Sequence, residues 1–462
     1  MAKVLISPIG TGSFKSGPDG DTSAREYNDA TYKFEKDDRI YKTPFLAAAL
    51  AQYIQVDKIV FIGTAKSMWE EVYRYFTVNS DRELKEDYWV EIGQLAMDSN
   101  PNISKINKEV LKETMESVDE YLKAIGSKSA GGSTPLIIKY GLNEDELWQN
   151  FSTIMELVDI LNDGDEIYLD ITHSFRSIPL FLYLMIDFML ILNQKKIKLK
   201  GLYYGMLEAT RDLGYAPVVD LGPLYEISSW IRGAHDFINY GNGYLISDLI
   251  KEKEGLPDNL EAISSKIKNI TELVNINYLT DLQNQIKGLN PLINGKYAST
   301  RALGYVFPLI KEFLSRFSNV QAASEFQLEL SKWYFENKKY GHGYICLVEA
   351  VLTKLCEVYD LDLEDIKNRE TVKELVTRRY FQRKSNDLAA LAEKYNGINK
   401  IRNRIAHASF YQEGNYSFSS DINQALHSYE EIRKLLNRRA VNELNTLIPM
   451  EEIQEYIKNR KQ

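Results

Sequence analysis

Apolar runs of strand length alternate with amphipathic stretches through residues 1 to about 222. The apolar runs are short and rich in β-branched residues, as buried strands are, and the stretches between them have helical periodicity. Strands are predicted over 3–9, 58–64, 135–141, 166–172 and 197–205, with a sixth candidate at 216–221, and helices over 43–54, 103–125, 144–161 and 177–190. Because crossover helices cover both faces of a parallel sheet, this alternation predicts an α/β domain with a mainly parallel sheet.

The strand pattern ends near Gly222-Pro223, a dipeptide that commonly interrupts regular structure. Beyond it the apolar periodicity is helical, as at 224–238, 343–361 and 422–447. A chain of 462 residues is also too long for one compact core. We therefore predict an α/β domain over 1–222 and an all-α region over 223–462. Residues 223 to about 320 suggest no specific function.

Composition narrows the class of protein. Hydrophobic residues make up 44% and charged residues 26%, as in water-soluble globular proteins. Cys346 and Cys356 have the spacing of neither a zinc site nor a disulfide framework, which favours a reducing cytoplasm. The chain opens in a strand-like run without a signal peptide, and its longest apolar run, 180–192, is shorter than the roughly 20 residues of a membrane span. That run predicts a buried helix, and we expect a cytoplasmic protein with no membrane contact, no metal and no other cofactor.

Small and polar residues gather where four of the predicted strands end. Open parallel sheets bind ligands at these ends, where hydroxyls and helix N-terminal N–H groups suit phosphate oxygens. Lys66 and Arg176 would add positive charge, and Phe175 and Tyr204 would offer stacking surfaces for bases. Ser, Thr and Gly also cap helices and form turns, but that interpretation does not explain why His173 and Arg176 crowd one strand end. The candidate ligand-binding residues are Ser7, Thr11, Gly12, Ser13, Gly63, Thr64, Lys66, Ser67, Thr172, His173, Ser174, Phe175, Arg176, Tyr204 and Gly205.

A second candidate site is the pair Arg402-Asn403 followed by His407. An offset of five places Arg402 and His407 near one helix face, or on either side of a helix end. Histidine transfers a proton near neutral pH and arginine neutralises charge on a phosphate, so the pair suits RNA cleavage without a metal. So short a motif also occurs by chance around a structural histidine. Residues 367–404 hold eleven Lys/Arg and four Asp/Glu, a local balance of +7, and this basic stretch favours a surface that faces RNA.

The opening VLISPIGTG, the segment DITHSFRSIPLFLYL and the motif R-N-x-x-x-H together resemble the CARF–HEPN ribonucleases of type III CRISPR systems, over nearly the whole chain. The resemblance implies a Rossmann-like CARF domain followed by a helical HEPN domain with its core at about 325–440. It implies a homodimer whose paired CARF domains bind a cyclic oligoadenylate, with cyclic tetra-adenylate expected before cyclic hexa-adenylate. Binding would activate a composite site, built from Arg402, Asn403 and His407 of each subunit, that cuts single-stranded RNA in antiviral defence.

In this interpretation a ribose 2′-OH attacks the adjacent phosphorus, His407 transfers a proton, Arg402 stabilises the developing charge, and Asn403 orients His407 or the phosphate. Three alternatives stay open: a ligand-responsive regulatory protein with a silent HEPN domain, a toxin-like RNA-modifying enzyme, and a transcription factor. The intact motif disfavours the first, and the activator-type first half disfavours the second. The third lacks a basic recognition helix, and the net charge of −9 argues against stable binding of duplex DNA.

Overall fold

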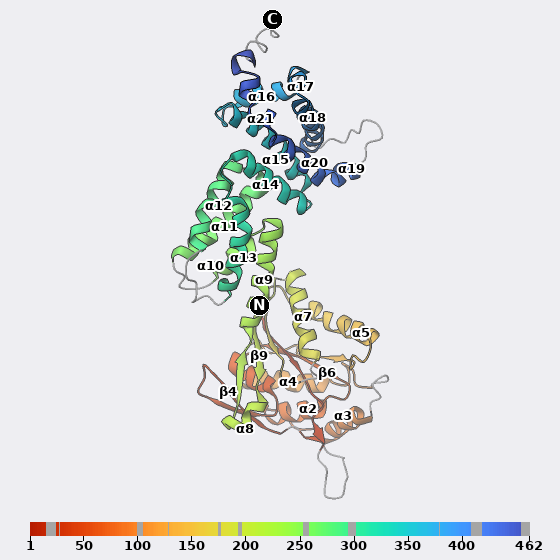
Figure 1. Ribbon diagram of the computed structural model, residues 1–462. Coiled ribbons are helices and arrows are strands. Elements are labelled where there is room, and N and C mark those ends of the chain that lie inside the picture. Colours follow the sequence, from red (N-terminus) through yellow and green to blue (C-terminus); the bar gives the residue numbers. More distant parts are fainter. Residues whose placement is uncertain are drawn as a thin grey trace. The chain divides into compact units, whose positions relative to one another are not determined.

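The computed structural model describes residues 1–14, 25–26, 28–98, 105–127, 129–173, 177–192, 196–252, 258–293, 302–377, 379–407 and 418–453. The chain divides into two compact units, Met1–Tyr225 and Glu226–Gln462 (Figure 1). The division falls within helix α9 (Gly222–Tyr240), which begins at the predicted Gly222-Pro223 interruption.

A mixed sheet forms the centre of the first unit. Its strands are β1 (Lys3–Pro8), β4 (Ala30–Phe34), β5 (Ile40–Thr43), β6 (Lys58–Thr64), β7 (Thr134–Ile138), β8 (Glu166–Asp170), β9 (Lys198–Gly205) and β10 (Ala216–Asp220). They lie in the order β5-β4-β10-β9-β8-β1-β6-β7. All neighbours from β9 to β7 are parallel, whereas the β9–β10 and β4–β5 pairs at the other edge are antiparallel. The prediction of an α/β domain with a mainly parallel sheet is therefore confirmed.

Each of the six predicted strand segments contains a strand, but the edge pair β4 and β5 was not predicted. Both are short and interleave polar with apolar residues, so the strand rule for buried runs does not find them. A small ribbon of β2 (Ser13–Phe14) and β3 (Arg25–Glu26) was also not predicted. The helix predicted over 103–125 begins later, at Lys112, because Asn107 closes a turn by accepting from the Val110 N–H.

Helices cover both faces of the sheet, as β1 illustrates. Val4 and Ile6 pack in a core with α5 and α7, and Leu5, which points to the opposite face, packs in a core with α1, α2 and α4. The helices of this unit are α1 (Leu46–Ile54), α2 (Trp69–Val78), α3 (Glu86–Asp98), α4 (Lys112–Ala124), α5 (Glu144–Met155), α6 (Leu157–Ile160), α7 (Ser177–Leu192) and α8 (Thr210–Leu213), with a 3-10 turn at Leu207–Ala209.

The second unit contains only helices among its described residues, so the prediction of an all-α second region is confirmed. One core lies among α9 to α14, and a second joins α15, α16, α18 and α20. Beyond α9 the helices are α10 (Tyr244–Lys251), α11 (Asp258–Ile276), α12 (Leu279–Ile293), α13 (Leu303–Ser318), α14 (Ala323–Glu336), α15 (Tyr340–Val358), α16 (Ile366–Thr377), α17 (Arg379–Lys384), α18 (Asn386–Ala406), α19 (Phe418–Asn423), α20 (Ala425–Leu436), α21 (Arg439–Asn442) and α22 (Leu444–Leu447).

Helix α7 departs from the sequence-based expectation. Only one of its faces is buried, through residues such as Leu182 and Ile186, so the prediction of a buried helix was wrong. The other face exposes four large apolar side chains, Leu180, Leu184, Phe188 and Ile191, which are 40% to 64% exposed. In the part of the chain that the structure describes, no helix is both long and apolar enough to cross a membrane.

Candidate functional site

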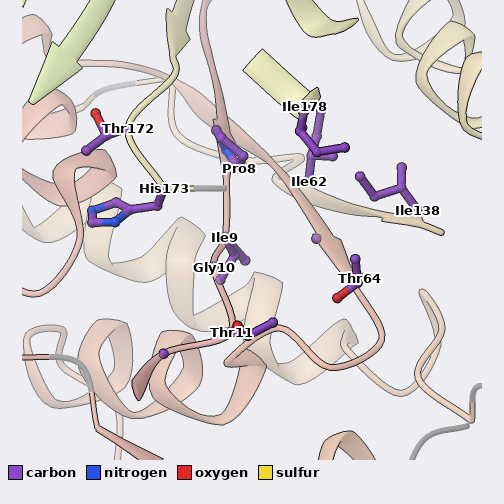
Figure 2. Close-up of a pocket in the computed structure, with 12 residues that line it drawn as sticks. Pro8, Ile9, Gly10, Thr11, Ile62, Thr64, Ile138, Thr172, His173 and Ile178 are labelled. Atoms are coloured by element: carbon purple, nitrogen blue, oxygen red, sulfur yellow. The ribbon is translucent and has the colours of Figure 1, made fainter. Parts of the chain in front are cut away.

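A cavity of about 260 Å³ lies in the first unit, where β1, β6, β7 and β8 end (Figure 2). Figure 2 shows Ile62, Ile138 and Ile178 together on one side, whereas Thr172 and His173 lie on the opposite side. The lining residues are Pro8, Ile9, Gly10, Thr11, Gly12, Ile62, Gly63, Thr64, Ile138, Thr172, His173 and Ile178. The cavity thus combines an apolar wall with hydroxyl and imidazole groups, at the sheet edge where open parallel sheets bind ligands.

The loop after β1 is fixed by the turn after β6. The Ser67 hydroxyl donates to the Ile9 carbonyl at 2.9 Å, and the Met68 N–H donates to the Gly10 carbonyl at 3.1 Å. Gly12 has a φ of +69°, and a Cβ there would lie 1.9 Å from the Met68 sulfur, so any other residue would strain the backbone and displace the Met68 side chain. The cavity wall is therefore built of constrained backbone.

A buried carboxylate supports the opposite wall. Asp170, at the end of β8, is fully buried and accepts hydrogen bonds from the Ser7 hydroxyl at 2.7 Å and the Thr172 N–H at 2.8 Å. Burial raises the pKa of Asp170, and burial lowers the pKa of His173 while the Asp170 charge opposes that shift. The Tyr32 hydroxyl lies 3.2 Å from the His173 Nε2. His173 is thus held in a fixed position by buried neighbours beside the cavity.

Six of the predicted ligand-binding residues line the cavity: Thr11, Gly12, Gly63, Thr64, Thr172 and His173. Four others lie behind or beside it. Ser7 and Ser67 are buried in the hydrogen bonds just described, the Gly205 N–H donates to the Thr172 hydroxyl at 2.8 Å, and the Tyr204 hydroxyl donates to Glu208 at 2.9 Å.

Lys66 is half-buried and does not line the cavity either. The side chain of Ser13, and the whole of Ser174, Phe175 and Arg176, lie outside the described residues. Sequence reasoning missed Asp170 and the isoleucines of the apolar wall. A charged residue inside a buried strand was a usable signal for Asp170, whereas strand isoleucines look like any core residue.

The second candidate site lies at the end of α18. Ser385 caps the start of this helix by accepting from the Leu388 N–H, and buried residues at helical spacing fix its inner face. Arg402 lies just before the last turn and is partly buried, and His407 is the exposed residue just past the end. The arginine and histidine therefore flank a helix end, one of the two predicted arrangements.

The Arg402 side chain is oriented by its neighbours. Its Nη1 donates to the Asn403 Oδ1 at 3.0 Å, and its Nη2 lies 3.7 Å from the Glu349 Oε1. Its Nε is buried and makes no hydrogen bond within the described protein. The Asn403 side chain thus contacts Arg402, while the Asn403 carbonyl accepts from the His407 N–H at 3.0 Å. The expected link between the Asn403 side chain and the His407 ring is not among the described hydrogen bonds.

Acidic residues neutralise more of the positive charge of the basic stretch 367–404 than its sequence indicates. Arg404 pairs with Asp421 at 2.7 Å and Lys394 with Glu431 at 2.7 Å, and Lys384 and Arg369 also pair with acidic residues from other helices. These partners lie outside the stretch, so the local balance of +7 overstates the charge that RNA would meet.

Comparisons with known proteins agree with this architecture. Residues 4–208 match the family described as CRISPR system endoribonuclease Csx1, CARF domain, and residues 226–325 match that described as CRISPR-associated protein MJ1674, second domain. The chain is therefore similar to the CRISPR-associated proteins that carry a CARF domain.

Within this class, the chain is similar to CRISPR-associated protein MJ1674 of Methanocaldococcus jannaschii, with 43% identity over 415 residues. The aligned region covers 90% of this chain and 63% of that relative, so the chain spans less than two thirds of the relative's length. A solved structure, Enterococcus italicus Csm6 bound to cyclic hexa-2'-fluoro-hexa-dAMP, aligns over 99% of this chain and 100% of its own, with a TM-score of 0.38 and 10% identity.

Proposed function

We propose that this chain is an endoribonuclease of CRISPR antiviral defence that a cyclic oligoadenylate activates. The observation that carries the proposal is Arg402, whose buried Nε–H lacks an acceptor in the described protein, close in sequence to the exposed His407 at the same helix end. A buried donor without an acceptor costs about 1–3 kcal/mol, a cost that functional sites retain. If activation exposes this N–H, a phosphate oxygen of RNA would supply the acceptor.

The proposed chemistry is attack of a ribose 2′-OH on the adjacent phosphorus. The bond to the 5′ oxygen breaks, leaving a 2′,3′-cyclic phosphate and a 5′-OH. His407 removes the proton of the nucleophile or donates one to the leaving oxygen, and Arg402 stabilises the negative charge on the phosphorane. Two copies of the motif in a homodimer would let one histidine act as base and the other as acid. A helical HEPN domain, with its core at about 325–440, would supply each copy.

The activator would bind at the cavity of the CARF domain. The Thr11, Thr64 and Thr172 hydroxyls offer hydrogen bonds to phosphate or ribose, and the isoleucine wall offers an apolar surface to a base. At about 260 Å³ the cavity lies below the roughly 300–1,000 Å³ of sites that enclose a small ligand. A cyclic tetra-adenylate, our first choice, or a cyclic hexa-adenylate would therefore place only a part of its ring in each cavity.

A homodimer would bring two such cavities to one ring. The exposed apolar residues of α7 supply a candidate contact, because Leu180, Leu184 and Phe188 recur every four residues and so share one helix face. Contiguous exposed apolar residues mark protein–protein contacts. Ile178, on the first turn of the same helix, lines the cavity, so pairing through α7 would bring the two cavities toward the two-fold axis.

The test is cleavage of a fluorescent single-stranded RNA with cyclic tri-, tetra- and hexa-adenylate added separately, each with and without a chelator. Cutting with one ring, unaffected by the chelator, is the expected result. Cutting that the chelator abolishes would overturn the metal-independent mechanism. Ring binding without cutting would instead identify a regulatory protein with a silent HEPN domain. Equal cutting of DNA, which lacks the 2′-OH, would contradict the chemistry.

A further inference from the structure

Glu349 joins three helices of the second unit next to Arg402. It lies on α15, and its two carboxylate oxygens face arginines of two other helices. One oxygen accepts a hydrogen bond from the Arg369 guanidinium of α16, and the other lies 3.7 Å from the Arg402 Nη2 of α18. Arg369 is itself held by the Thr353 hydroxyl, to which its Nη1 donates at 3.2 Å. Glu349 is thus anchored on one side and faces Arg402 on the other.

The balance of charge in this group favours an anionic ligand. One carboxylate lies between two guanidiniums, so a net positive charge remains after Glu349 is paired. The direct hydrogen bond of Glu349 goes to Arg369, and its distance to Arg402 is that of an ion pair and not of a hydrogen bond. Glu349 can therefore orient the Arg402 guanidinium without occupying all of its donors.

A row of polar atoms on α18 adds a second observation. The Tyr395 hydroxyl, the Asn399 Oδ1 and the Arg402 Nε are buried at helical spacing, and none has a hydrogen-bond partner in the described protein. Burial raises the pKa of Tyr395 to about 12, and the Glu349 charge acts in the same direction. A buried polar row of this kind is costly for stability, and such costs persist where a site must hold charge in a fixed place.

We propose that Glu349 is a positioning residue for RNA cleavage, which acts by fixing the Arg402 guanidinium against the phosphate. Asn403 holds Nη1 and Glu349 faces Nη2, so the plane of the guanidinium is fixed through both terminal nitrogens. The inference rests on the proposed ribonuclease function. The competing explanation is purely structural, because buried Arg–Glu–Arg groups can be replaced by apolar side chains without loss of stability or activity.

The first experiment compares Glu349→Gln with the wild type, as full-length chains, in RNA cleavage with the ring found to activate. A displaced guanidinium stabilises the transition state less, so we expect kcat to fall on the order of 10- to 100-fold with little change in KM. Glu349→Asp, which keeps the charge, should recover part of the rate. The matched control is Glu329→Gln, because Glu329 is 24% exposed against 29% for Glu349 and also pairs with an arginine, Arg316, at 3.5 Å.

A second measurement separates positioning from a structural role. In an Arg402→Lys background the planar fork that Glu349 would orient is gone, so Glu349→Gln should slow cutting by less than about threefold. Thermal melts give the folded fraction, and rates are taken per folded molecule. An equal fold-change in both backgrounds, a rate matching the Glu329→Gln control, or faster cutting by Glu349→Gln would each overturn the positioning role.

The two proposals fail in different ways. If the wild type cuts no RNA with any ring, the proposed function fails and the role of Glu349 fails with it. If the wild type cuts, His407→Ala does not, and Glu349→Gln keeps the wild-type rate, only the role of Glu349 is overturned.

Discussion

The two candidate sites are built in opposite ways. At the cavity of the first unit, the buried polar groups are paired: Asp170 accepts from Ser7 and Thr172, and Ser67 holds the loop after β1. At the end of α18, the Arg402 Nε is buried without a partner and His407 is exposed. The first site is complete before a ligand arrives, whereas the second keeps unpaired donors. This difference fits a preformed sensor and a cleavage site that its substrate or a second subunit completes.

The largest expected effect is a loss of RNA cutting when the site at the end of α18 is changed. His407→Ala should reduce RNA cutting by at least about 100-fold, because the proton transfer is lost, while binding of the ring is unchanged. His427→Ala is the control, since this histidine is also exposed but lies on α20, where it pairs with Glu431 of the same helix, and this variant should cut normally. Cleavage is followed by gel and ring binding by calorimetry. Undiminished cutting by His407→Ala would remove the contrast between the two sites.

Binding of the ring at the cavity of the first unit is tested by Gly12→Ala. The added methyl group would collide with Met68 and strain the backbone, so we expect ring affinity to fall at least about tenfold. Gly214→Ala is matched in strain, with a φ of +76°, but a Cβ there meets nothing within 4 Å. It should bind the ring normally. Calorimetric affinities that are equal for the two variants would show that the loop after β1 takes no part in binding.

The proposed pairing of two chains through α7 is tested by Leu184→Glu. A charge on the exposed apolar face of α7 should weaken self-association at least about tenfold, because a dimer contact would bury it. Leu213→Glu is the control, since Leu213 is 51% exposed against 49% for Leu184 but lies on α8. Analytical ultracentrifugation gives the mass. A dimer that survives Leu184→Glu would place the contact elsewhere.

The smallest effect concerns pH. Burial lowers the pKa of His173 below its ordinary 6.5, so the unfolded chain binds this proton first. The stability that neutral His173 provides is complete above about pH 6.5 and is lost as the pH falls. His173→Gln should therefore lose less unfolding free energy than the wild type between about pH 7.5 and 5.5, as urea denaturation measures. Equal losses in both chains would assign the pH dependence to other groups.

The local pattern of apolar and polar residues predicted many of the strands and helices. It did not predict the contacts between segments that are distant in the sequence. The runs at 58–64 and 166–172 predicted β6 and β8, and the polar residues at and just after the ends of these runs predicted Thr64, Thr172 and His173 at the cavity. Hydrophobicity alone misjudged α7, since apolar composition does not distinguish a helix buried in one unit from one with an exposed apolar face. Glu349 lies far from Arg402 in sequence and was not predicted, because only the packing of α15 on α18 brings them together.

The small volume of the cavity has a consequence for the amount of activator that the protein needs. If one ring is shared by two cavities of about 260 Å³, a calorimetric titration should saturate at about half an equivalent of ring per chain. Each messenger molecule would then switch on two chains. The number of active chains in a cell would rise with the number of messenger molecules until there is one messenger for every two chains. A further rise in messenger would activate no more chains.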